Sequence, residues 1–396
     1  MKPTVVLAFA ASLASAACAA QHQVMQSGSP LPDVSERAMR VYREAYVIDT
    51  HNDLPDRIFE DRYNPDVRHA GGFGPETGNT DFPRLVESNI SAVFLAAFID
   101  AEYKAPGVAW PRVLAYVDTV HAFVARHPDH LRFAASAADI RAAKRDGKVA
   151  ILVGVEGGHA IENSLEKLAE LQRRGVRYMT LTWNNGNDWA GSSIGVGESR
   201  KGGLTDFGRQ VVREMNRLGI LVDLSHVSDS TFFDAVAASS VPVIASHSSA
   251  RALSNHPRNL SDDQLRALAK NGGVANVNFY DAFLDEKYFR AKAEVDARIP
   301  SGPERLAAYR ELTPTPLAIL VDHIDHIAKV AGIDHVGIGS DFDGVGGHVP
   351  AQMEDVTRLP RIAQALLDRG YSEADVKKIL GGNMLRVMDA AIDHRP

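Results

Sequence analysis

The chain has 396 residues, of which 45% are hydrophobic, and a formal net charge of −7. This much apolar material can bury a large core, and no block of lysine or arginine suggests a nucleic-acid partner, so we expect none. The single cysteine, Cys18, excludes a framework of disulfides within the chain.

The first 20 residues have the composition of a secretory signal. Lys2 is followed by an apolar, uncharged stretch that ends in small residues and is too short for a transmembrane helix. We therefore expect export to the periplasm or secretion, with residues 21–35 as a polar N-terminal tail and residues 36–396 as a single domain. The alternative is a lipoprotein that a lipid on Cys18 anchors to the membrane.

Eight short apolar runs alternate with helical patterns in the rest of the chain. Strands that are apolar throughout are typical of parallel sheets buried under helices, and eight of them favour a closed barrel. The predicted fold is therefore α/β, a TIM-like (β/α)8 barrel. The expected strands cover residues 46–50, 91–98, 149–155, 178–183, 220–224, 241–246, 273–279 and 335–339. Helical patterns between them include residues 165–174, 206–218, 262–270 and 316–331.

Two connections are longer than a barrel needs. Residues 57–80 follow the first predicted strand and are rich in glycine, asparagine and proline, and residues 280–313 follow the seventh. Both leave from the carboxyl ends of the strands, where the active-site loops of such barrels lie. We expect them to roof a pocket; the alternative is a pair of solvated insertions without a role.

Residues of the types that bind metals stand where several predicted strands end. His51 and Asp53 lie two positions apart after the first strand, so their side chains lean the same way. Glu156 follows a run of apolar residues, where a carboxylate is costly to bury unless it meets a positive charge. Its two oxygens suit a position that bridges two ions.

Two histidines and an aspartate complete this pattern. His226 and His247 each follow a strand of their own, and Asp341 follows the eighth. In a parallel barrel all these side chains converge on one face. Nitrogen and oxygen ligands without thiolates suit zinc, with manganese or cobalt as further possibilities. The pattern predicts a hydrolase with two metal ions.

From about residue 47 to residue 388 the chain resembles the membrane (renal-type) dipeptidases of the amidohydrolase superfamily. The shared motifs are His-Asn-Asp-Leu-Pro at 51–55, Val-Glu-Gly-Gly-His at 155–159, Asp-Leu-Ser-His-Val-Ser at 223–228, Ser-His-Ser-Ser at 246–249, Arg-Asn-Leu-Ser-Asp-Asp at 258–263, Asn-Phe-Tyr at 278–280 and Ser-Asp-Phe-Asp-Gly at 340–344. Together these motifs are specific, although each alone is not.

The resemblance implies two zinc ions per chain and hydrolysis of short peptides with a free C-terminal carboxylate, by attack of a hydroxide that bridges the ions. It implies one ion on His51, Asp53 and Glu156, and the other on Glu156, His226 and His247. It further implies Asp341 as the catalytic acid and base, Arg258 as the group that binds the substrate carboxylate, and Tyr280 as a neighbouring substrate contact. A homodimer is also implied.

One position departs from the family. A family histidine that helps to hold the polarised carbonyl is replaced here by Trp183, whose indole donates one hydrogen bond and cannot become cationic. Asn184 or Asn185 could supply an amide donor instead. The alternative function is therefore metal-dependent hydrolysis of another amide or a lactam. A third hypothesis, a barrel that only binds, is disfavoured because the full ligand set is present.

Two further places in the sequence contain histidines that could belong to a site. The residues of 322–326, which include His323 and His326, lie in a helical pattern, and we interpret them as a solvated helix face. His159 follows Glu156 by three positions and either orients the site or has no role there.

Overall fold

The computed structural model describes residues 31–195 and 202–393. The predicted signal, Cys18 and most of the predicted tail lie outside these described residues. Within them, no helix is both long and apolar enough to cross a membrane.

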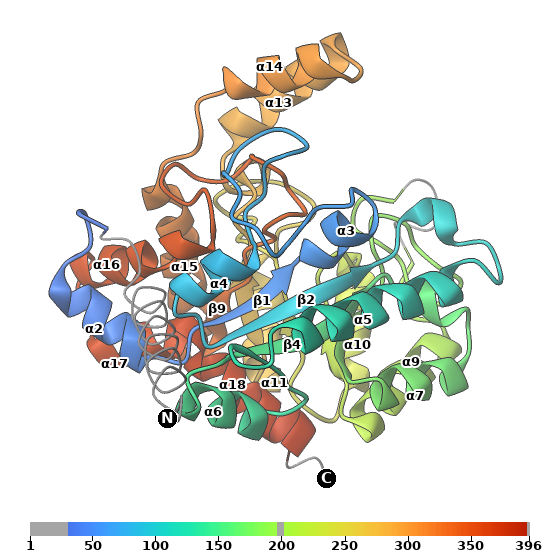
Figure 1. Ribbon diagram of the computed structural model, residues 1–396. Coiled ribbons are helices and arrows are strands. Elements are labelled where there is room, and N and C mark those ends of the chain that lie inside the picture. The colour runs from blue at the N-terminus through green and yellow to red at the C-terminus, as the bar shows by residue number, and fades with distance from the viewer. Residues whose placement is uncertain (1–30, 196–201, 394–396) are drawn as a thin grey trace, which may run out of the picture.

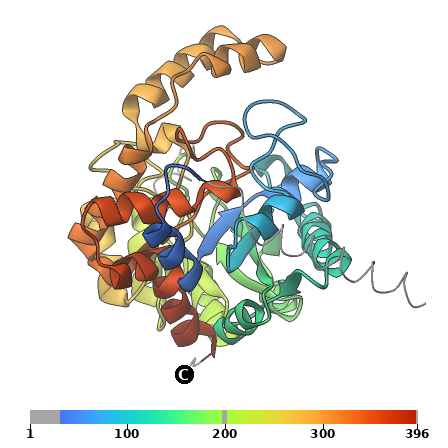
Figure 2. The same cartoon turned by 60° about the vertical axis from the view of Figure 1, so that its left-hand side comes forward.

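Eight parallel strands close into a barrel surrounded by helices, which confirms the predicted fold (Figures 1 and 2). The ring closes because β2 pairs with both β1 and β4, and because β9 pairs back onto β1, where Asp49 lies opposite Ile338. The barrel strands are β1 (Ile48–Asn52), β2 (Ala92–Phe98), β4 (Val149–Glu156), β5 (Val176–Thr180), β6 (Leu221–Asp223), β7 (Ile244–Ala245), β8 (Val274–Val277) and β9 (Val336–Ile338).

The sheet differs from the prediction in two places. A ninth strand, β3 (Leu131–Phe133), pairs with the first residues of β4, beside the point where β5 pairs with the last ones. It was not predicted because three residues with a central arginine make no apolar run. The fourth predicted strand is β5, which ends at Thr180 because the Leu181 carbonyl accepts from Nδ2 of Asn187. Trp183 therefore lies in a loop rather than in a strand.

The helices expected from the sequence are present, and their ends agree within one residue. They are α7 (Leu165–Arg173), α9 (Asp206–Leu218), α11 (Asp262–Asn271) and α15 (Leu317–Ala331). A serine or threonine N-cap begins each of the first three by accepting from a backbone N–H of the first turn. The other helices outside the long connections are α2 (Glu36–Glu44), α4 (Phe82–Glu87), α5 (Ala109–Arg126), α6 (Ala137–Arg145), α10 (Asp229–Ala238), α16 (Pro360–Asp368), α17 (Glu373–Lys377) and α18 (Asn383–Met388).

The connection predicted as a loop over residues 280–313 is largely helical. It forms α12 (Asp281–Leu284), α13 (Glu286–Arg298) and α14 (Pro303–Arg310), and the last two project beyond the carboxyl end of the barrel (Figure 1). The connection over residues 57–80, which begins in α3 (Leu54–Phe59), packs against this projection. There Nη2 of Arg310 donates to the Phe73 carbonyl at 2.7 Å, and the Phe73 and Tyr309 rings lie 5.8 Å apart.

The interpretation of residues 322–326 as a solvated face is wrong for His323. His323 is fully buried on α15, because it shares a helix face with the buried Leu320, Ile324 and Ile327. Its Nδ1 accepts from the Ala250 N–H at 3.0 Å, and its Nε2 donates to the Leu284 carbonyl at 3.0 Å. It therefore joins α15 to the loop after β7 and to the end of α12 (Asp281–Leu284).

Candidate metal centre

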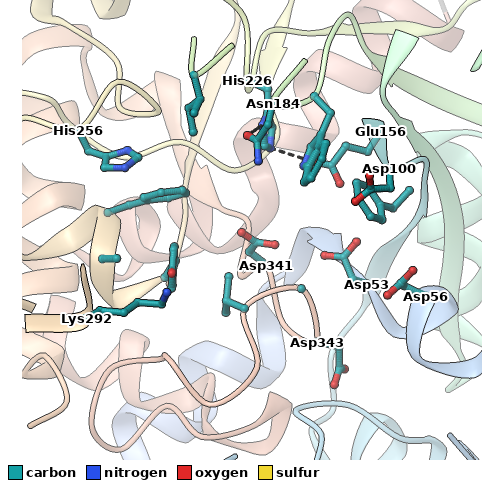
Figure 3. A pocket seen from close by; sticks show the side chains of 18 of the residues that line it. Asp53, Asp56, Asp100, Glu156, Asn184, His226, His256, Lys292, Asp341 and Asp343 are labelled. Atoms are coloured by element: carbon teal, nitrogen blue, oxygen red, sulfur yellow. Dashed lines mark hydrogen bonds and ion pairs between the residues drawn. The ribbon is translucent and has the colours of Figure 1, made fainter. Parts of the chain in front are cut away.

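The five residues predicted as metal ligands meet at the carboxyl end of the barrel, and all are buried. Nε2 of His51 lies 3.3 Å from Oδ2 of Asp53 and 3.4 Å from Oε2 of Glu156. The other oxygen of Glu156, Oε1, lies 2.8 Å from Nε2 of His226 and 3.5 Å from Nε2 of His247. The two oxygens of Glu156 thus face two different sets of ligands. Figure 3 shows Asp53, Glu156 and His226 around one cavity, with Asp341 facing them.

The hydrogen bonds of two histidines leave their Nε2 atoms unprotonated. Nδ1 of His226 donates to Oδ1 of Asn184 at 3.1 Å. Nδ1 of His247 donates at 2.7 Å to Oγ of Ser246, whose own proton goes to Oδ2 of Asp223 at 2.6 Å. The two Nε2 lone pairs then face each other at 3.0 Å, an arrangement that is repulsive unless a cation lies against both. The donor set therefore fits a divalent metal.

His51 shows the same need for a cation. Its Nε2 is buried and has no hydrogen-bond partner among the described residues, although carboxylate oxygens surround it. Its Nδ1 lies 2.8 Å from the hydroxyl of the fully buried Tyr178. The ring of Tyr178 fits only because Gly154 lacks a side chain, since a Cβ there would lie 2.0 Å from it. Sequence analysis missed this role because Tyr178 falls inside an apolar strand pattern.

Asp341 lies beside the half of the site that contains His51. Its Oδ1 is 4.0 Å from Nε2 of His51, and its Oδ2 accepts from Nδ2 of Asn278 at 2.7 Å. The loop is tight here, because a Cβ on Gly344 would lie 2.6 Å from Oδ1 of Asp341 and 2.2 Å from Oδ2 of Asp53. Asn278 was not predicted as a site residue, although a polar residue between Val277 and Phe279 at a strand end was a usable signal.

Electrostatics also favour a cation at this position. The pKa of Asp341 is raised to about 8, chiefly by burial and also by the nearby Asp53 and Glu156 carboxylates, while His51 opposes the rise. Burial likewise raises the pKa of Asp53 to about 6 and lowers the pKa of His226 to about 3. Several carboxylates are therefore crowded into one desolvated place, and a divalent cation relieves their repulsion more completely than a shared proton.

Arg258 is a buried arginine, only 2% exposed, and not a surface one. It donates from Nη1 to Oγ of Ser248 at 3.3 Å and from Nη2 to the His247 carbonyl at 3.2 Å, and its Nε has no partner among the described residues. Burial lowers its pKa to about 10, so it stays cationic at neutral pH. No carboxylate pairs with it within the described part of the chain, which leaves donors for an anionic ligand.

The cavity above the predicted ligands, called the metal cavity below, has a volume of about 430 Å³. Two of the predicted substrate contacts, Tyr280 and Asn184, line it, and so does Trp183, which replaces the family histidine. Asn185 does not: it lines a neighbouring pocket, and its Nδ2 lies 3.5 Å from Nδ1 of the buried His159. His159 therefore contacts the loop that carries Asn185 and not the predicted metal ligands.

Comparisons with known proteins show the family of the chain. A family model described as membrane dipeptidase (peptidase family M19) matches residues 35–395. The chain is similar to the crystal structure of the probable dipeptidase PvdM from Pseudomonas aeruginosa, with 28% identity, a TM-score of 0.79 and coverage of 90% of this chain and 98% of that one. It is similar to a metallopeptidase from Rhodobacter sphaeroides, liganded with a phosphinate mimic of the dipeptide L-Ala-D-Ala, at 28% identity, TM-score 0.71 and coverage of 88% and 99%. A dipeptidase AC of family M19 matches at 28% identity, TM-score 0.72 and coverage of 88% and 98%.

The hydroxyl of Tyr178 offers a test of metal binding that leaves the ligands intact. Tyr178→Phe keeps the ring but removes the contact to Nδ1 of His51, so we expect metal affinity to fall about 10- to 100-fold. Competition with a chromophoric chelator measures this. The control is Tyr371→Phe, which removes a hydroxyl that donates to Asp325, far from the metal cavity. Unchanged affinity in Tyr178→Phe would mean that His51 needs no such support.

Proposed function

Because the chain belongs to the membrane dipeptidase family, peptidase family M19, and is a metallo-dipeptidase, we propose that it uses two zinc ions to hydrolyse dipeptides with a free C-terminal carboxylate. The observation that carries this proposal is the position of Glu156, whose Oε2 faces His51 while its Oε1 faces His226 and His247. A single shared carboxylate between two nitrogen sets suits a pair of ions rather than one.

The ligands would divide between the ions as the resemblance implies. His51, Asp53 and Glu156 would hold one ion, and Glu156, His226 and His247 the other. When bound, such a pair polarises a scissile carbonyl and lowers the pKa of an attacking water. The absence of thiolates from the set is compatible with zinc, manganese or cobalt.

Asp341 would move the proton. Asn278 fixes Oδ2 of Asp341, which leaves Oδ1 facing the ligand side of the cavity. From there Asp341 accepts a proton from the attacking water and donates it to the leaving amine.

Arg258 would set the length of the substrate. Its guanidinium is held by Oγ of Ser248 and the His247 carbonyl, and it lies over the ring of Phe283, which lines the metal cavity. A planar guanidinium binds a carboxylate with two hydrogen bonds. A terminal carboxylate fixed there would place the scissile bond of a dipeptide toward the metal ligands, since Arg258 is bonded to the backbone of His247. The Rhodobacter relative, which was solved with a dipeptide mimic, supports the same substrate class.

Trp183, which replaces the family histidine, is the reason for the alternative function, hydrolysis of another amide or a lactam. It lines the metal cavity and packs edge-on against Phe98, with ring centroids 4.8 Å apart. We propose Asn184, and not Asn185, as the residue that compensates for the family histidine, because Asn184 lines the same cavity. If this compensation fails, the metal centre would serve another amide or a lactam.

We also propose that the protein is exported, as a periplasmic or secreted enzyme or as a lipoprotein through Cys18. The composition of residues 1–20 supports this. A homodimer is proposed from the family resemblance alone. Mass spectrometry of the mature N-terminus would distinguish removal of the whole segment from a lipid on Cys18.

The proposed function is tested with a panel of L,L- and L,D-dipeptides and the zinc-loaded mature protein, by quantifying released amino acids. We expect cleavage that a chelator abolishes and that zinc restores. Protein with two metals per chain that cleaves no dipeptide but opens a lactam would contradict the peptidase proposal and favour the alternative.

Asp341→Asn tests the proton transfer. The amide cannot accept the proton of water, so we expect turnover to fall by about 100- to 10,000-fold while elemental analysis still finds two metals per chain. The control is Asp322→Asn on the exposed side of α15, which should leave turnover unchanged. Near-normal turnover of Asp341→Asn would exclude the acid and base role.

Arg258→Ala tests carboxylate binding. We expect KM for free dipeptides to rise about 10- to 100-fold, the value of a charged hydrogen bond, with little change for the same dipeptides as C-terminal amides. The control is Arg251→Ala, whose guanidinium pairs with Asp229 instead. Equal effects on acids and amides would count against this role.

A further inference from the structure

Four aromatic rings form one wall of the metal cavity. Tyr280 and Phe283 lie 4.8 Å apart between centroids, His256 and Phe283 4.5 Å apart, and His256 and Phe289 5.1 Å apart. All four residues line the cavity. They come from three separate places, namely the loop after β7, the start and end of α12, and α13. Below, these four residues are called the aromatic subsite.

The aromatic subsite is uncharged. Burial lowers the pKa of His256 to about 4, so its ring is neutral at neutral pH, and its Nδ1 accepts from the Arg258 N–H at 3.2 Å. Lys292, which lines the cavity beside these rings, is neutralised by Asp296, whose Oδ2 lies 2.7 Å from its Nζ. This wall therefore attracts an apolar group rather than an ion.

The opposite wall has a different character. Asp56 and Asp100 lie there, across the cavity from His256 and Lys292, with Asp341 between the two sides (Figure 3). An apolar side chain gains no favourable free energy by lying against carboxylates. When it packs on aromatic rings, its apolar surface is removed from water, which is favourable. Phe98, two residues before Asp100, and Trp183 line the cavity as well, so what distinguishes the aromatic subsite is its contact with Arg258.

Arg258 fixes which end of a dipeptide meets the aromatic subsite. Its Cζ lies over the Phe283 ring at 5.3 Å, so the carboxylate-binding group and the aromatic wall are one packed unit. In a dipeptide, the C-terminal carboxylate and the side chain of the same residue branch from one Cα. A carboxylate on Arg258 therefore brings that side chain, and not the N-terminal one, to the rings.

We propose that the aromatic subsite binds the side chain of the C-terminal residue and selects dipeptides in which that residue is aromatic or large and aliphatic. This inference rests on the proposed function and specifies its substrate class. Phe289 is 43% exposed, so a bound side chain would cover apolar surface that water otherwise contacts. Ala293, one helical turn beyond Phe289 on α13, also lines the cavity and leaves space for such a side chain.

The test compares kcat/KM for Gly-Ala, Gly-Leu and Gly-Phe, in the stereochemistry that the dipeptide panel selects. We expect the wild type to prefer Gly-Phe to Gly-Ala by about tenfold or more, and Phe289→Ala to remove most of this preference through KM while Gly-Ala cleavage persists. Because Phe289 is already 43% exposed, its truncation leaves the core intact. The control is Phe233→Ala, 42% exposed on α10 and outside the cavity, which should keep the preference.

A second variant fills the space instead of emptying it. Ala293→Leu should lower kcat/KM for Gly-Phe several-fold more than for Gly-Ala, because the added side chain occupies the subsite. Equal cleavage of Gly-Ala and Gly-Phe by the wild type, or a loss in Phe289→Ala that is the same for both substrates, would overturn the proposal. Either result leaves dipeptide cleavage itself intact, whereas cleavage of no dipeptide would overturn the proposed function.

Discussion

The buried carboxylate of Glu156 is the constraint on which the rest of the site depends. At 4% exposure it has lost nearly all contact with water, and such a charge is strongly destabilising unless positive partners surround it. Three histidine nitrogens lie within 3.5 Å of its two oxygens, each on a different strand end. Glu156 meets these three nitrogens only when the barrel is closed, and its buried charge favours cations beside it.

A layer of hydrogen bonds beneath the ligands holds their strands in register. Asp49 accepts from the N–H and Oγ of Ser340, which joins β1 to the end of β9. Asp223 accepts from the N–H and Oγ of Ser246 in the same way, and so joins β6 to the end of β7. Both carboxylates are fully buried and satisfied, so they align strand ends without entering the cavity. His247 is oriented directly by one of these pairs, through Ser246.

The barrel and the meeting of His51, Glu156 and His226 could be predicted because strand ends in a parallel barrel share one face. Apolar runs marked the strands, and capping residues marked the helices. The role of Tyr178 could not be predicted, because it acts across the barrel on His51, far away in the sequence. Asn278 acts on Asp341 at the end of the neighbouring strand, and its polar side chain between apolar residues was an unused signal. The helices of residues 280–313 were not predicted. This segment does not pack on the barrel strands, so its apolar residues lack the regular spacing that marks a barrel helix.

The pairing of β9 with β1 has a consequence for the order of events during synthesis. Asp49 and Ile338 are partners in the ladder, so the strand that carries His51 and Asp53 is not enclosed until almost the whole chain has left the ribosome. Contacts this distant in sequence form slowly, because the loop between them must first close. Because the proposed centre needs residues from both ends of the chain, we expect tight metal binding only after β9 has paired with β1.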